Sequence, residues 1–166
     1  MTVFIAAIGA TVSAIFELTV GPYLRVGDAQ PHFVLIFAII WTVAVGLEAG
    51  LAGAFVGGLV LDVLAPRPLG ASAFVLVLCV GLAATITRLF PRVRPLLVAP
   101  LVGLVSLVYS MTLFFLLGAL GSNIDSKDPV SILTPGVVYD TVVAVLIGPL
   151  AVAIHDRRVG DERPTW

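Results

Sequence analysis

GAFVGGLVLDVLAPRPLG, residues 53–70, is apolar and rich in glycine until a carboxylate, Asp62, interrupts it. Two prolines around an arginine follow, and the stretch closes on Gly70. Because proline lacks a backbone donor and clashes with the preceding turn, the pattern predicts that one apolar helix ends here and another begins. An acid at this place is open to three interpretations: a catalytic group, a contact for a transported substrate, or a residue at a helix end.

The composition of the whole chain indicates a membrane protein. Of its 166 residues, 60% are hydrophobic and 11% are charged, and the mean hydropathy is +1.15. Soluble domains contain roughly 25% charged residues. Since helices satisfy their own backbone hydrogen bonds in lipid, we expect an all-α integral membrane protein. The net charge is −1 and the basic residues are scattered, so the composition argues against nucleic acid as a partner and favours the lipid bilayer.

Six segments have the length and composition expected of membrane-spanning helices, which need about 20 apolar residues. We expect one bundle of six transmembrane helices in residues 1–156 and a short cytoplasmic tail in residues 157–166. GLEAG joins the second and third segments, and its glycines predict a tight turn rather than one long helix. The expected spans are residues 2–20, 32–47, 49–65, 70–90, 95–120 and 135–155.

The arginines predict how the bundle is oriented. Six spans place both termini on one side of the membrane, and cytoplasmic loops carry the excess of basic residues. With both termini in the cytoplasm, six of the nine basic residues lie inside: Arg88, Arg92, Arg94, Arg157, Arg158 and Arg163. No basic segment precedes the first apolar run, so we expect this run to be a retained span rather than a cleaved signal.

Two stripes of small residues follow helical spacing. The third span carries Gly50, Gly53 and Gly57, and the first span carries Ala6, Ala10 and Ala14. Small side chains let helix backbones approach closely in a membrane, where dispersion contacts replace the hydrophobic effect. Each stripe is therefore either a packing face inside the bundle or a docking interface for a helix of another protein.

Three acids occupy similar depth near the outer ends of their spans, and these are Glu17, Asp62 and Asp140. Charged groups inside a membrane generally face the bundle and find partners. One interpretation pairs them with Arg25 and Arg67, which lie at the same level; the other is an outward-facing polar cavity lined by at least two of them. For Asp62 we also expect hydrogen bonds from backbone N–H groups at the start of the next helix, near Gly70.

The histidines and the cysteine do not form a catalytic or metal-binding pattern. His32 and His155 fall on opposite faces in the expected topology, so they cannot act together, and each is typical of an interfacial residue. Cys79 has no second thiol and lies in an apolar run. We therefore expect no enzyme activity, no metal and no cofactor.

With these spans in place, residues 1–158 resemble the MreD family, the rod shape-determining membrane proteins of bacteria. The most specific part runs from AQPHFVLIFAIIW through GLEAGLAGAFVGGLVLDVLAPRPLG. TPGVVYDTVVAVLIGPL, near the last span, is a weaker match. Four positions at the helix end and bend agree with the family pattern, namely Asp62, Pro68, Leu69 and Gly70.

The chain also departs from the family pattern at three places, which are His32, the bend of residues 65–67, and Asp140. The resemblance implies a non-catalytic scaffold of the cell-elongation complex in the bacterial inner membrane, with a fold like that of the S components of energy-coupling-factor transporters. The implied partners are MreC, the actin-like MreB, and a peptidoglycan polymerase made of a SEDS glycosyltransferase and a class B penicillin-binding protein.

A second function belongs to another class of protein. Small six-span proteins with this orientation also resemble the vitamin-binding S components themselves, which dock their transporter through alanine-spaced small residues in an early span. The stripe Ala6, Ala10 and Ala14 fits that alternative, and so does an outward acidic pocket. Residues 53–70 match the MreD family better, and the loops offer few aromatic or hydrogen-bonding residues to close over a vitamin.

Overall fold

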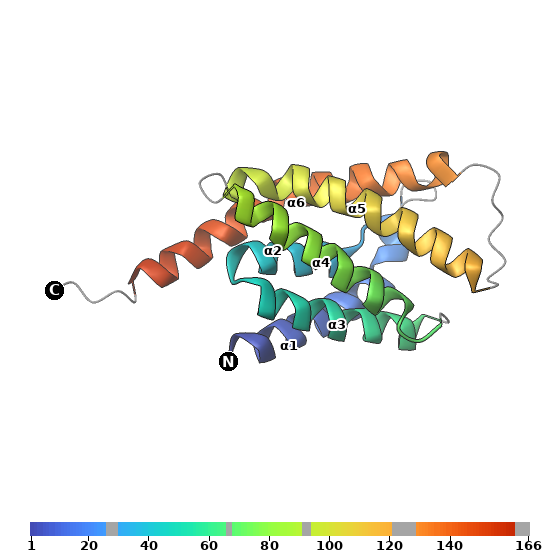
Figure 1. Ribbon diagram of the computed structural model, residues 1–166, viewed down its shortest axis with the longest axis horizontal. Coiled ribbons are helices and arrows are strands. Elements are labelled where there is room, and N and C mark those ends of the chain that lie inside the picture. The colour runs from blue at the N-terminus through green and yellow to red at the C-terminus, as the bar shows by residue number, and fades with distance from the viewer. Residues whose placement is uncertain (26–29, 66–67, 91–93, 121–128, 162–166) are drawn as a thin grey trace.

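The computed structural model describes residues 1–25, 30–65, 68–90, 94–120 and 129–161, and it describes the side chains of residues 1–25, 30–65, 68–90, 98–120 and 134–153. This part of the chain is helical (Figure 1). The elements are α1 (Thr2–Thr19), a single 3-10 turn η1 (Gly21–Leu24), α2 (Phe33–Ala44), α3 (Leu47–Leu64), α4 (Ala71–Leu89), α5 (Arg94–Ala119) and α6 (Pro129–Asp161).

The six predicted helices are confirmed, and one of them is shorter than expected. Five helices are long and apolar enough to cross a membrane, whereas α2 has 12 residues. At 1.5 Å per residue α2 is roughly 18 Å long, well short of a hydrocarbon core of about 30 Å. The predicted turn in GLEAG is present and explains the early end of α2. Gly46 in this turn has a φ of +131°, a conformation that residues with a Cβ atom rarely adopt.

The short helix α2 lies at the centre of the bundle. Each of the five longer helices packs on it, and most of its side chains are buried. Around α2, neighbouring pairs are α1 with α3, α3 with α4, α4 with α5, and α5 with α6. Figure 1 shows α1 and α6 on opposite sides of the bundle with α4 between them in front. The short central helix is thus surrounded by the five helices that are long and apolar enough to cross a membrane.

Ala6 and Ala10 face Gly53 and Gly57 across the contact between α1 and α3, whereas Gly50 packs on Thr42 of α2. Ala6, Ala10 and Ala14 are fully buried. A Cβ atom built on Gly57 would stand 3.1 Å from the Cβ of Ala10, and one built on Gly53 would stand 3.6 Å from the carbonyl oxygen of Ala6. The structure therefore uses both stripes inside the bundle, so another protein could reach them only if α1 left α3.

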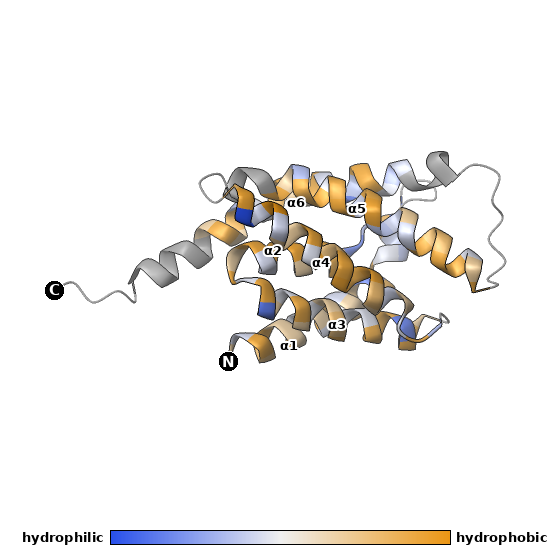
Figure 2. Cartoon of the chain, viewed as in Figure 1, coloured by the Kyte–Doolittle hydropathy of each residue, from blue (hydrophilic) through white to orange (hydrophobic). Residues whose placement is uncertain are grey.

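The first residue of α1 and the last residue of α6 lie at the same end of the bundle (Figure 1). Helix α6 continues to Asp161, so the expected start of a tail at residue 157 falls within this helix. Apolar colour covers most of the described helices in Figure 2, and saturated blue is confined to a few places. Polar groups are therefore few on the described helices, and the buried ones among them are the candidates for a functional or structural site.

Candidate functional site

Three buried carboxylates mark the candidate site, and each caps a helix to which it does not belong. Glu17, Asp62 and Asp140 are 3%, 2% and 0% exposed. The first backbone N–H groups of any helix have no hydrogen-bond acceptor within that helix, and the core of a membrane has no water to act as the acceptor. A carboxylate both accepts these hydrogen bonds and neutralises the positive end of the helix dipole.

Asp62, near the end of α3, caps the start of α4. Its Oδ2 accepts the N–H groups of Gly70 at 2.9 Å and Ala73 at 3.4 Å, and the Ser72 N–H lies 3.0 Å from Oδ1 and 3.1 Å from Oδ2. Gly70 is the N-cap residue and has a φ of +89°, which glycine adopts without strain. The hydrogen bonds expected of Asp62 near Gly70 are thus present, and three backbone donors share one carboxylate.

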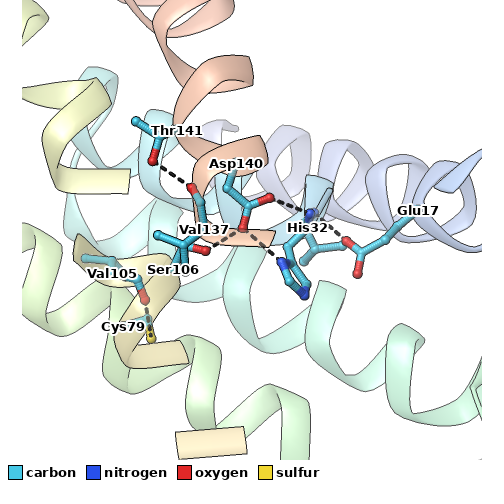
Figure 3. Close-up of polar contacts among 9 residues, drawn as sticks. Glu17, His32, Cys79, Val105, Ser106, Val137, Asp140 and Thr141 are labelled. Carbon is cyan, nitrogen blue, oxygen red and sulfur yellow. Dashed lines mark hydrogen bonds and ion pairs between the residues drawn. The ribbon is translucent and has the colours of Figure 1, made fainter. Parts of the chain in front are cut away.

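Two other acids hold the start of α2, each from a different helix. Oδ1 of Asp140, on α6, accepts the backbone N–H of His32 at 2.8 Å, and Oε2 of Glu17, on α1, accepts the N–H of Val34 at 3.0 Å. In Figure 3 these two side chains approach His32 from opposite sides. Because α2 is short, its N-terminus lies in the bundle, and α1 and α6 provide the acceptors that a local cap would otherwise supply.

Asp140 also binds two side chains through its other oxygen. The Nδ1 atom of His32 lies 2.8 Å from Oδ2, and the hydroxyl of Ser106, on α5, donates to the same oxygen (Figure 3). The ring of Tyr109, one turn along α5, meets the His32 ring edge to face with centroids 5.3 Å apart. His32 and Asp140 therefore connect α2, α5 and α6 at one point.

This arrangement is that of a structural network. In a nucleophilic triad the serine donates to a histidine base, which a carboxylate orients from behind. Here Ser106 donates to the carboxylate itself and not to the histidine, so the arrangement is not that of a nucleophilic triad. Among the described residues, no three histidine, cysteine or acidic side chains gather as metal ligands, and Cys79 is buried against α5.

Comparison with known proteins gives one match. The family model of the rod shape-determining protein MreD matches residues 1–154. The chain belongs to the MreD family. No curated protein and no solved structure matches it. The match runs from α1 through most of α6, so all three carboxylates lie within the MreD region, and the chain is a rod shape-determining membrane protein.

The two arginines expected to pair with the acids of this MreD chain are Arg25, which is exposed, and Arg67, which lies outside the described residues, so the pairing with Arg67 stays a prediction. The observed partners are backbone N–H groups, Ser106 and His32, the residue expected to be merely interfacial. The His32 side chain is partly exposed, and its contact with Asp140 was not expected from the sequence; His155 lies outside the described side chains.

The three acids divide between two places. Glu17 and Asp140 both accept backbone N–H groups at the start of α2, whereas Asp62 accepts those at the start of α4. At the bend of the MreD motif, the carbonyl of Pro68 accepts the N–H of Ala71 at 3.2 Å, and Leu69 is exposed. Pro68 thus shapes the entry to α4.

Two members of the network, Ser106 and Tyr109, were not among the residues singled out from the MreD sequence. A signal for them exists in the pattern, because Ser106, Tyr109 and Ser110 are spaced three and four residues apart in an otherwise apolar span. All three are buried on one face of α5. Polar side chains on one face of a membrane helix generally point into the bundle, and this rule would have found them.

Proposed function

We propose that this MreD-family chain is a non-catalytic scaffold of the bacterial cell-elongation complex, in the cytoplasmic membrane with both termini in the cytoplasm. In this role it binds MreC and helps to position or regulate peptidoglycan synthesis. MreB, a SEDS glycosyltransferase and a class B penicillin-binding protein are further members of the same complex.

One observation supports this proposal above the others: the buried acids accept backbone N–H groups at helix starts. Carboxylates that carry out chemistry or move ions need access to a substrate or a water path. Glu17, Asp62 and Asp140 instead fix the positions of α2 and α4. A rigid bundle with apolar outer faces is suited to holding other membrane proteins in place.

The charges near the two ends of the bundle support the proposed orientation. Arg88 ends α4 at the end where α1 begins, and residues 157–163 of the sequence add three arginines near the C-terminus. An excess of arginine faces the cytoplasm in membrane proteins. In this orientation the starts of α2 and α4, with their carboxylates, lie toward the periplasmic side.

Depletion of the protein in its native host tests the proposed function. We expect rod-shaped cells to become round and to lose lateral wall growth, and a plasmid copy of the gene should restore both. The vitamin-transport alternative predicts a different result. Rods that persist after depletion while uptake of one vitamin is lost would contradict the scaffold proposal.

A further inference from the structure

A cleft of about 370 Å³ opens at the end of the bundle where α1 begins. Three parts of the chain line it, namely Thr2 of α1, the turn from α2 into α3 at residues 45–49, and Arg88 of α4. Thr2 and Leu47 are the first residues of two candidate spans, and Arg88 is the last residue but one of a third. Because spans end where the hydrocarbon meets the headgroups, the cleft lies at the level of the lipid headgroups.

Two opposite charges line this cleft from different helices. The carboxylate of Glu48 belongs to the first turn of α3, and the guanidinium of Arg88 belongs to the last turn of α4. Figure 2 shows saturated blue at the start of α3 and at the end of α4. Within the described part of the chain, neither side chain takes part in an ion pair. Both charges are therefore available to a ligand that enters the cleft.

The rest of the lining is largely apolar. Val45 and Leu47 flank the turn, and Ala49 is buried next to them. A Cβ atom built on Gly46 would meet nothing within 4 Å, so there is open space over the backbone of the turn. A molecule that complements this lining carries an anionic group, a cationic group and an apolar part.

We propose that this cleft binds the headgroup of a zwitterionic phospholipid that carries a primary ammonium group, as phosphatidylethanolamine does. Arg88 binds the phosphate, because a planar guanidinium donates two parallel hydrogen bonds to phosphate oxygens. Glu48 accepts hydrogen bonds from the ammonium group, and Val45 and Leu47 contact the apolar part of the lipid. In the proposed orientation this lipid belongs to the cytoplasmic leaflet, whereas the binding itself does not depend on the proposed function.

Glu48 determines which headgroup the cleft prefers. Basic pockets between transmembrane helices bind anionic lipids such as cardiolipin. Here a carboxylate lies in the same cleft as the arginine, so it repels a headgroup that carries only negative charge. Phosphatidylglycerol has such a headgroup and has no ammonium group to donate to Glu48. The cleft therefore selects phosphatidylethanolamine over phosphatidylglycerol.

Native mass spectrometry of the purified full chain tests this selection. Phosphatidylethanolamine or phosphatidylglycerol with identical acyl chains is added in detergent, and the fraction of protein with bound lipid gives the affinity. The variants are Arg88→Gln and Glu48→Gln, and both side chains are exposed, so folding should persist. Arg25→Gln is the matched control, because Arg25 is an exposed arginine that follows η1, beyond the other end of α1. Gel filtration and circular dichroism verify that each variant is folded.

We expect the wild type to bind phosphatidylethanolamine more tightly than phosphatidylglycerol. Arg88→Gln should weaken the binding of phosphatidylethanolamine by about tenfold, because it loses charge-assisted hydrogen bonds. Glu48→Gln should bind the two lipids equally, and Arg25→Gln should behave as the wild type does. Equal affinities of Arg88→Gln and Arg25→Gln for phosphatidylethanolamine, or a wild type that prefers phosphatidylglycerol, would overturn the proposal.

Two further measurements separate a lipid from other occupants of the cleft. Free phosphoethanolamine presents the same charged groups without acyl chains, and it should bind far more weakly than the lipid. Equally tight binding would assign the cleft to a soluble ligand and overturn the proposal. A benzophenone side chain at position 2 should label phospholipid in native membranes, and labelling of protein alone would assign the cleft to a protein partner instead.

Discussion

At the scale of single residues, the hydrogen bonds of Asp62 explain why an acid lies at the end of an apolar helix. Three backbone N–H groups of the bend and of α4 converge on its two oxygens. An amide has only one oxygen, and its NH₂ group would face donors instead of acceptors. A neutral cap of the same shape therefore leaves at least one buried N–H group without a partner, which explains the carboxylate at this position.

The ranking of two Asp62 variants tests this explanation. We expect Asp62→Asn to lower the free energy of unfolding by about 1–3 kcal/mol, because a buried donor loses its acceptor. Asp62→Leu removes every acceptor and should cost more than Asp62→Asn. Thermal unfolding of the purified protein in detergent measures both, and wild-type midpoints for the two variants would show that the carboxylate does not hold α4.

At the scale of helices, the packing of α3 against α1 and α2 depends on Gly57, which has no side chain. A Cβ atom on Gly57 would stand 2.6 Å from Val34 and 3.1 Å from Ala10, closer than ordinary contact. The tight crossing also brings Glu17 within reach of the start of α2. Packing and capping are thus coupled, since a wider gap between α1 and α3 would move the acceptor that α2 needs.

A matched pair of glycine substitutions separates packing from a general effect of added bulk. Gly57→Leu overfills the crossing and should destabilise the protein by about 1–3 kcal/mol or more. Gly81→Leu, in the middle of α4, adds the same side chain where a Cβ atom meets nothing within 4 Å, so it should be tolerated. Equal unfolding midpoints for Gly57→Leu and the wild type would contradict a close-packed crossing.

The helices themselves could be predicted from the sequence, because glycine and proline mark most of their ends. Gly46 separates α2 from α3, and Pro68 and Gly70 precede α4. The depth at which α2 starts could not be predicted, since hydropathy does not distinguish a span from a core helix. The bond from His32 to Asp140 joins residues 108 positions apart, so it depends on how α6 packs on α2 and no local pattern encodes it.

At the scale of the whole molecule, the polar groups stabilise a bundle whose outer faces are left for other molecules. The stripe of Ala6, Ala10 and Ala14, which favoured a vitamin transporter component, is buried against α3. The exposed apolar faces of α1 and α6 remain, on either side of the central helix. The buried polar groups thus lie in the interior of the bundle, whereas its exposed side chains are largely apolar.

A rescue experiment with amide variants tests whether the three acids have only a structural role in this bundle. Depleted cells receive Glu17→Gln, Asp62→Asn or Asp140→Asn, and the fraction of rods is measured against the amount of folded protein in the membrane. Shape should follow the folded amount for all three variants, because the carboxylates are expected to act only by holding the helix starts. A variant that reaches the wild-type folded amount and yet restores no rods would contradict a purely structural role for the carboxylates.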